Sequence, residues 1–120
     1  MGLNIRATRR VSLAEFATGW DDCFLTVSVI PGNAAEVLQD KIDLCKKMDD
    51  AKGLSQLLQD TCSEAIQGGV ILNTDDSGEQ SSYKFSKDEA PEVVAALGDA
   101  WCIHVIDVAT GTDRLKSMRN

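Results

Sequence analysis

The sequence predicts a small α+β domain with elements in the order α-β-α-α-β-β-α. Its 120 residues are the length of one ordinary domain, and 43% apolar with 26% charged residues is a globular composition. Apolar residues recur at helical spacing in several stretches, and β-branched runs bounded by turn residues lie between them. We therefore expect a single domain over residues 11–110, with a flexible basic lead over 1–10 and a flexible tail over 111–120.

A short helix is expected to open the domain. Ser12 and Glu15 have the spacing of a capping box, in which each side chain bonds the other residue's backbone amide. Val11 and Phe16 can form the hydrophobic staple that accompanies such a box. Gly19 would end this helix after about two turns.

A strand is expected over residues 23–30, where β-branched and aromatic side chains dominate. One of its two faces is wholly apolar and consists of Cys23, Leu25, Val27 and Val29. That face should pack on helices.

Two helices joined by a short polar connection are expected next. The first covers about residues 34–49, with Asn33 as its cap, and its buried face consists of Ala34, Val37, Leu38, Ile42, Leu44, Cys45 and Met48. The second has the clearest helical stripe of the chain, made of Leu54, Leu57, Leu58, Thr61, Cys62, Ala65 and Ile66, and Gly68-Gly69 would close it. So short a connection predicts an antiparallel αα-hairpin.

A β-hairpin is expected from the strands at residues 70–73 and 81–85, which flank a turn-rich acidic tip. The tip also has the acidic spacing of a calcium-binding EF-hand loop. Lys84, however, occupies the position at which such a loop needs a bidentate Glu. We therefore predict a hairpin and no calcium site.

Two interpretations of the last element stay open. Asp88 is the better cap, because a capping box of Ser86 with Glu89 would place Pro91 in the second helical turn. The favoured interpretation is one helix up to residue 108, with a stripe of Val94, Leu97, Trp101, Val105 and Val108. The alternative stops at Gly98 and makes residues 102–108 a strand.

Charge is distributed unevenly along the chain. Between residues 15 and 110 there are 18 acidic residues against six lysines, a net charge of −12. The arginines all lie near the two ends, at Arg6, Arg9, Arg10, Arg114 and Arg119. An acidic body argues against a nucleic-acid partner, since phosphate backbones require concentrated Lys and Arg. The basic ends are typical of solvated termini or docking segments.

The sequence contains no motif that indicates catalysis, a cofactor or a metal. Its four cysteines include no C-x-x-C pair, and the single histidine, His104, has Cys102 two residues before it but no third ligand nearby in sequence. Neither a nucleophile elbow nor a phosphate-binding loop is present. No apolar run is long enough to span a bilayer, and residues 1–10 do not have the pattern of a signal peptide. We therefore expect a cytoplasmic protein that is not an enzyme and has no membrane partner.

The overall layout resembles the small tail assembly chaperones of long-tailed bacteriophages. The shared features are a basic lead into residues 11–16, Trp20 followed by a strand over residues 24–30, a helical middle, and a late helix at Pro91 that enters a polar tail. The similarity covers most of the chain. The four cysteines and the long acidic hairpin tip depart from the family pattern.

The resemblance implies a function in protein binding. Such chaperones coat the tape measure protein, a long apolar helix, keep it soluble in the host cytoplasm and recruit tail tube subunits. A longer form made by ribosomal frameshift is often present, and self-association is compatible with this role. The candidate partner-binding residues are Leu54, Leu57, Leu58 and Trp101, with Arg114 and Arg119 in the tail. For the four apolar residues, ordinary core packing is the competing interpretation.

Two other functions fit the same observations. A subunit of the phage tail or neck would remain in the assembled particle, and its arginine-bearing ends would become ordered on contact. A small inhibitor would block a host protein through its acidic surface, in a complex that weakens with salt.

Overall fold

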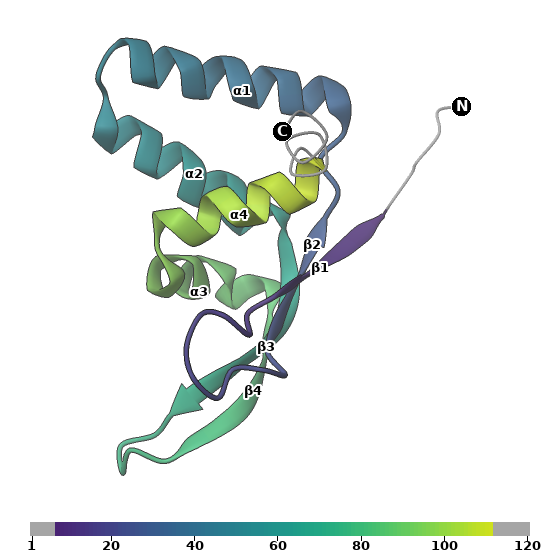
Figure 1. Cartoon of the computed structure of the whole chain (residues 1–120), viewed down its shortest axis with the longest axis vertical. Coiled ribbons are helices and arrows are strands. Elements are labelled where there is room, and N and C mark those ends of the chain that lie inside the picture. Colours follow the sequence, from purple (N-terminus) through teal and green to yellow (C-terminus); the bar gives the residue numbers. More distant parts are fainter. Residues whose placement is uncertain (1–6, 112–120) are drawn as a thin grey trace.

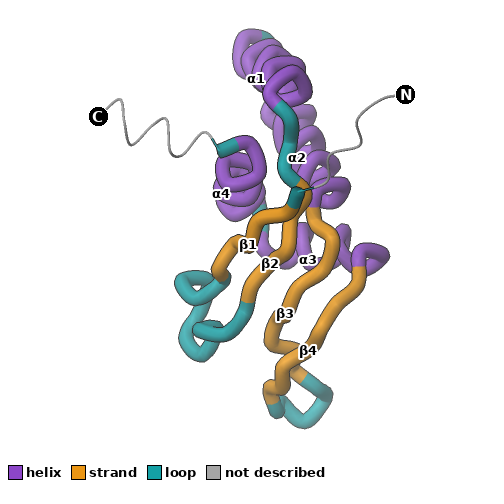
Figure 2. The backbone as a smooth tube through the Cα atoms, turned by 90° about the vertical axis from the view of Figure 1, so that its right-hand side faces the viewer, coloured by secondary structure: helices purple, strands orange, loops and turns teal. Residues whose placement is uncertain are grey.

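An antiparallel sheet with helices on one side forms the centre of the fold (Figures 1 and 2). The computed structural model describes residues 7–111. Within them the strands are adjacent in chain order: β1 (Thr8–Ser12), β2 (Phe24–Ser28), β3 (Ile66–Thr74) and β4 (Gln80–Ser86). The helices are α1 (Gly32–Lys47), α2 (Ala51–Ala65), α3 (Ala90–Leu97) and α4 (Asp99–Thr110), with a 3₁₀ turn, η1 (Lys87–Glu89), before α3. The predicted α+β class is confirmed.

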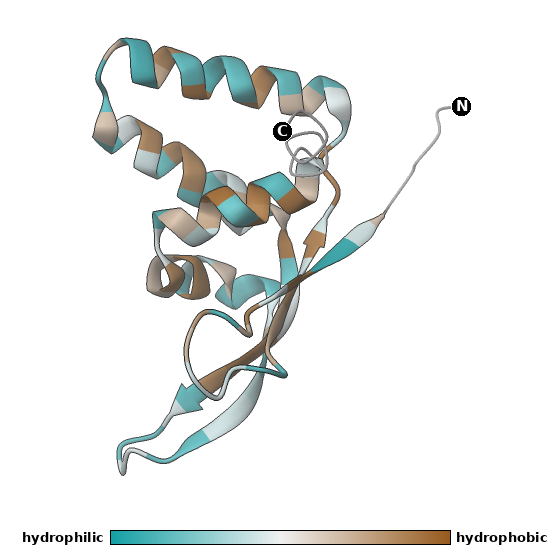
Figure 3. Ribbon diagram, in the orientation of Figure 1, coloured by the Kyte–Doolittle hydropathy of each residue, from teal (hydrophilic) through white to brown (hydrophobic). Residues whose placement is uncertain are grey.

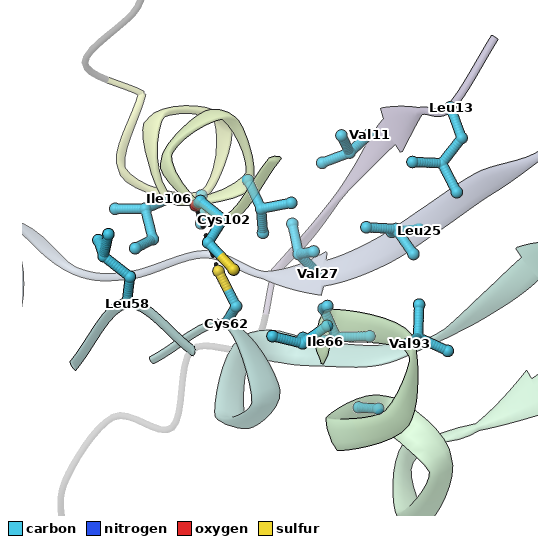
Figure 4. Packing of buried hydrophobic residues seen from close by; sticks show 14 of the residues in the cluster. Val11, Leu13, Leu25, Val27, Leu58, Cys62, Ile66, Val93, Cys102 and Ile106 are labelled. Carbon is cyan, nitrogen blue, oxygen red and sulfur yellow. Dashed lines mark hydrogen bonds between the residues drawn. The ribbon is translucent and has the colours of Figure 1, made fainter. Parts of the chain in front are cut away.

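The core lies between the sheet and helices α2, α3 and α4 (Figure 4). Cys23, Leu25 and Val27 are buried, so the apolar face predicted for this strand does pack on helices. From the helices, Cys62 of α2 and Val105 of α4 complete the packing. The strand itself is shorter than the predicted range 23–30.

The predicted first helix is wrong, because β1 ends at Ser12 and residues 13–19 form turns. Val11 pairs with Leu25 across the sheet, and Val11 and Leu13 are both fully buried. An isolated helix of two turns is marginal in water, whereas pairing with β2 buries these side chains completely. The Ser12 hydroxyl accepts a hydrogen bond from the Ala14 amide at 3.2 Å, so it closes a turn and caps no helix.

The predicted flexible lead over residues 1–10 is also too long. Within the described residues, Thr8 to Arg10 belong to β1. The Arg9 guanidinium donates to the Val108 carbonyl at 3.2 Å, and Arg10 lies 3.9 Å from the centroid of the Phe24 ring. Two of the arginines assigned to free ends are therefore part of the fold. Residues 1–6 and 112–120 lie outside the described residues.

The αα-hairpin is confirmed, and α1 and α2 run side by side in opposite directions (Figure 1). The Asp50 carboxylate caps α2 by accepting from the Gly53 amide at 2.9 Å. The predicted Asn33 cap is wrong. The cap position of α1 is Pro31, which has no side-chain hydrogen bond to offer, and Asn33 falls inside the first turn.

Gly68 and Gly69 do not end α2, as predicted, but lie within β3. A Cβ at Gly69 would collide with the Phe24 carbonyl oxygen, and its φ of 155° is one that L side chains rarely adopt. The two glycines thus allow close approach of β2 and β3, and the chain passes from α2 into β3 at Ile66 without a loop.

The last element is two helices, separated at Gly98 with φ of 89°. The capping box of Ser86 with Glu89 does form, within η1, so the predicted Asp88 cap is wrong. The 3₁₀ turn lets α3 begin after this box, and Pro91 then occupies the first turn, where it is tolerated. Residues 102–108 are helical, which excludes the strand alternative.

The β-hairpin of β3 and β4 is confirmed. At its tip the Asp75 carboxylate accepts hydrogen bonds from the Ser77 hydroxyl at 2.6 Å and from the amides of Ser77 and Glu79 at 2.9 Å. These bonds, the hydroxyl first, lower the pKa of Asp75. The carboxylate is therefore used to close the loop. Among residues 7–111, no helix is long and apolar enough to cross a membrane.

Candidate partner-binding site

Helix α1 exposes apolar side chains that the sequence places on a buried face. Val37, Leu44 and Met48, just past the helix end, are 54%, 56% and 68% exposed, and only Leu38 of the 16 helical residues is buried. Figure 3 shows brown, apolar segments recurring along this outlying helix. Successive residues turn by about 100° in a helix, so Leu38 and Ile42 can face α2 while the other three share a second, more exposed side of the helix. We call Val37, Leu44 and Met48 the outer stripe.

A groove lies between α1, α2 and α4. Its volume is about 180 Å³. We call it the apolar groove, and it is lined by Ala35, Leu38, Gln39, Ile42, Lys46, Leu54, Leu58, Ile103, Ile106, Asp107 and Thr110. Small-molecule sites usually enclose roughly 300–1,000 Å³, so this volume suits a few side chains of a partner better than a metabolite.

The structure brings together only part of the predicted site. Leu54 and Leu58 line the apolar groove, although Leu58 is itself buried in the core. Leu57 lies on another side of α2, where it lines a separate cavity with Val37. Trp101 lines neither, and its ring instead meets the ring of Phe16 edge-on, with centroids 5.8 Å apart. Arg114 and Arg119 lie outside the described residues.

Sequence reasoning missed the groove residues on α4. Ile103 is 48% exposed and Ile106 lies deeper, and both line the groove opposite α1. The signal was present in the spacing of Cys102, Val105, Ile106 and Ala109, which are the buried residues of α4. Once these face the core, Ile103 has to point outward on the same helix.

The groove is chemically suited to binding and has little that could react. Of the described residues that line it, only Lys46 and Asp107 are ionisable. The Thr110 hydroxyl donates to the Ile106 carbonyl at 2.8 Å, so this polar group is engaged within α4. Lining of this kind can hold apolar side chains but offers no nucleophile paired with a base.

The buried thiols of Cys62 and Cys102 are the other chemically notable group (Figure 4). The Cys62 thiol donates to the Cys102 carbonyl at 3.2 Å. Its hydrogen bonding with Cys102, and then burial, raise the pKa of Cys62. A thiol with a raised pKa carries little thiolate, so Cys62 is a core residue and a poor nucleophile.

Comparisons with protein-family models, with curated proteins and with solved structures gave no match. Within residues 7–111, three of the five exposed large hydrophobic side chains, Val37, Leu44 and Met48, lie in α1 or directly after it.

Proposed function

We propose that this protein is a non-enzymatic tail assembly chaperone of long-tailed bacteriophages, acting in the host cytoplasm. It would hold an apolar helix of the tape measure protein in the apolar groove and recruit tail tube subunits. The layout of the sequence suggests this family, and the apolar groove, with Ile103 half-exposed in its lining, is the single observation that supports the binding role.

The position of α1 supports helix binding. Most helical stability in proteins comes from burying an apolar face, yet α1 buries one residue and packs mainly on α2. Exposed apolar surface of this kind is typical of a protein-interaction site. A partner helix laid along the groove could bury Ile42 and Ile103 from the two sides, in the manner of other helix-in-groove complexes.

Charge supports the solubilising part of the role. The net charge of −12 over residues 15–110 would stay exposed around a bound helix, because the groove lining contains few charged residues. Mutual repulsion between such complexes opposes aggregation. An apolar tape measure helix would thus become part of an acidic particle.

Co-expression with the longest helical protein encoded nearby tests the proposal. We expect that protein to be soluble only when this chain is present. Ile103→Asp should reduce the soluble partner by about fivefold or more, because an unpaired carboxylate would be buried among apolar side chains. The soluble fraction after centrifugation, measured by quantitative blotting, reads out the effect.

Val37→Asp is the matched control, since Val37 is similarly exposed but lies outside the apolar groove. It should leave partner solubility nearly unchanged. A partner that stays insoluble with or without this chain would rule out the chaperone role. Loss of solubility with Val37→Asp but not with Ile103→Asp would move the binding site to the outer stripe.

A further inference from the structure

The face of the sheet that the helices leave uncovered carries positive charge. Figure 2 looks onto this face, with α3 behind the strands. Arg10, Phe24 and Lys84 point toward it, because the next residue along each of their strands is buried in the core. Strand alternation therefore places two cations and an aromatic ring on one open surface.

Two rows of residues across the strands shape a groove on this face. Phe24 pairs with Val70, and Val70 pairs with Lys84, which makes a row with long side chains. The adjoining row runs from Arg10 through small residues only: Thr26, Gly68 and Ser86. Because Gly68 has no side chain, the surface is lower along this second row than along the row of Phe24, Val70 and Lys84. This basic sheet groove has a volume of about 580 Å³.

Among residues 7–111, three cations and no carboxylate line the basic sheet groove. Lys87 is already engaged, since its ammonium donates to the Glu64 carbonyl at 2.7 Å. Arg10 lies over the Phe24 ring, which leaves the edge of its guanidinium able to donate to a bound acceptor. Lys84 is exposed, and no carboxylate within residues 7–111 forms an ion pair with it. Arg10 and Lys84 are thus available to an anionic partner.

We infer that the basic sheet groove binds an extended acidic peptide segment of a partner protein, in which Arg10 and Lys84 each pair with a carboxylate. Adjacent strands lie about 4.8 Å apart, so Lys84 and the Phe24 ring under Arg10 are separated by roughly 10 Å. An extended chain of the polyproline II type rises about 3.1 Å per residue and has about three residues per turn. Acidic residues at positions i and i+3 of such a peptide therefore share one face and lie roughly 9 Å apart, which matches the two cations.

A peptide fits this surface better than a nucleic acid. The body around the groove has a net charge of −12 over residues 15–110, which repels a continuous phosphate backbone but tolerates two localised carboxylates. Single-stranded nucleic acids also rely on bases stacking on aromatic rings. Here the guanidinium of Arg10 already covers the ring of Phe24. The surface lies on the opposite side of the sheet from the helices, so this inference does not depend on the helix-binding role.

Fluorescence anisotropy with two labelled ten-residue peptides tests the inference. One peptide has Glu at every third position, and the other has Gln at the same positions. We expect the full chain to bind the Glu peptide more tightly, with an affinity that falls as salt increases. Arg10→Gln and Lys84→Gln should each weaken binding about two- to fivefold, the range of an exposed ion pair. Lys52→Gln, at an exposed position on α2, removes the same charge and should change the affinity less than about twofold.

Thermal unfolding of each variant would first establish that it is folded. Lys84 makes no ion pair in the described residues, so its variant remains informative even if Arg10→Gln loosens the packing on Phe24. Equal binding of the Glu and Gln peptides, or an affinity that neither groove variant changes, would overturn the inference. Tighter binding of a ten-nucleotide oligothymidine, lost in the same variants, would also overturn it in favour of a nucleic acid.

Discussion

Helices α1 and α4 both have apolar stripes, yet the fold uses them in opposite ways. In α4, four of 12 residues are buried, and the helix packs against α2 and the sheet. In α1, one of 16 is buried, and apolar side chains remain in contact with water. An amphipathic stripe thus determines that a helix forms and which of its faces is apolar. Whether that face is buried by the same chain depends on where the other elements of the fold lie.

The largest expected effect is on stability. Ile106→Ala in α4 should lower the free energy of unfolding by about 2–3 kcal/mol, because it leaves a cavity in packed surroundings. Leu44→Ala in α1 should change it by less than about 0.5 kcal/mol, since that side chain is already exposed. Urea denaturation followed by circular dichroism measures both. Comparable decreases in the free energy of unfolding for the two variants would show that the apolar surface of α1 is buried in solution.

Thiol alkylation gives a second contrast between the same helices. Cys45 of α1 is half-buried, whereas Cys102 of α4 and its neighbour Cys62 are buried. We expect iodoacetamide at pH 8 to modify Cys45 at least about tenfold faster than Cys62, which reacts only when the core opens. The raised pKa of Cys62 keeps its thiol protonated, so raising the pH to 9 should leave it protected.

Peptide mass spectrometry over a time course would give both alkylation rates. Full reaction of all four cysteines in urea is the control that each thiol is competent. Equal rates for Cys45 and Cys62 in the native protein would contradict the arrangement of α2 against α4.

Local patterns predicted most elements, and the errors have physical causes. The β2 strand, the αα-hairpin and the β-hairpin each follow from periodicity and turn residues, which act within a few positions. The strand β1 was missed because Ser12 and Glu15 satisfy a local helix signal. What decides the outcome is pairing of Val11 with Leu25, a contact with a residue in another strand.

The candidate site was harder to predict than the fold. The stripe of α1 contains both Leu38, which is buried, and Leu44, which is exposed, and the sequence does not distinguish them. Burial depends on α2 and α4, whose positions come from the whole fold. The basic sheet groove requires the register of all four described strands, because Arg10 and Lys84 are far apart in sequence. Neither surface could be found by spacing alone.

The smallest expected effect concerns how the two helical regions begin. Within residues 7–111, no side chain caps α1. Before α3, by contrast, the Glu89 carboxylate accepts from the Tyr83 hydroxyl at 2.6 Å and from the Ser86 amide at 3.2 Å. These bonds, that of Tyr83 first, lower the pKa of Glu89 in the folded protein. Its stabilising contribution is therefore present above the unfolded pKa and is lost as pH falls through the folded pKa.

Glu89→Gln should be slightly less stable than the original chain at pH 7, and the difference should shrink between about pH 5 and pH 3. Thermal unfolding across this range measures it, with Asp88→Asn as the adjacent control. If the difference in stability between Glu89→Gln and the original chain were the same at every pH, Glu89 would act through packing. The charge of Glu89 would then not be what distinguishes the start of α3 from the uncapped start of α1.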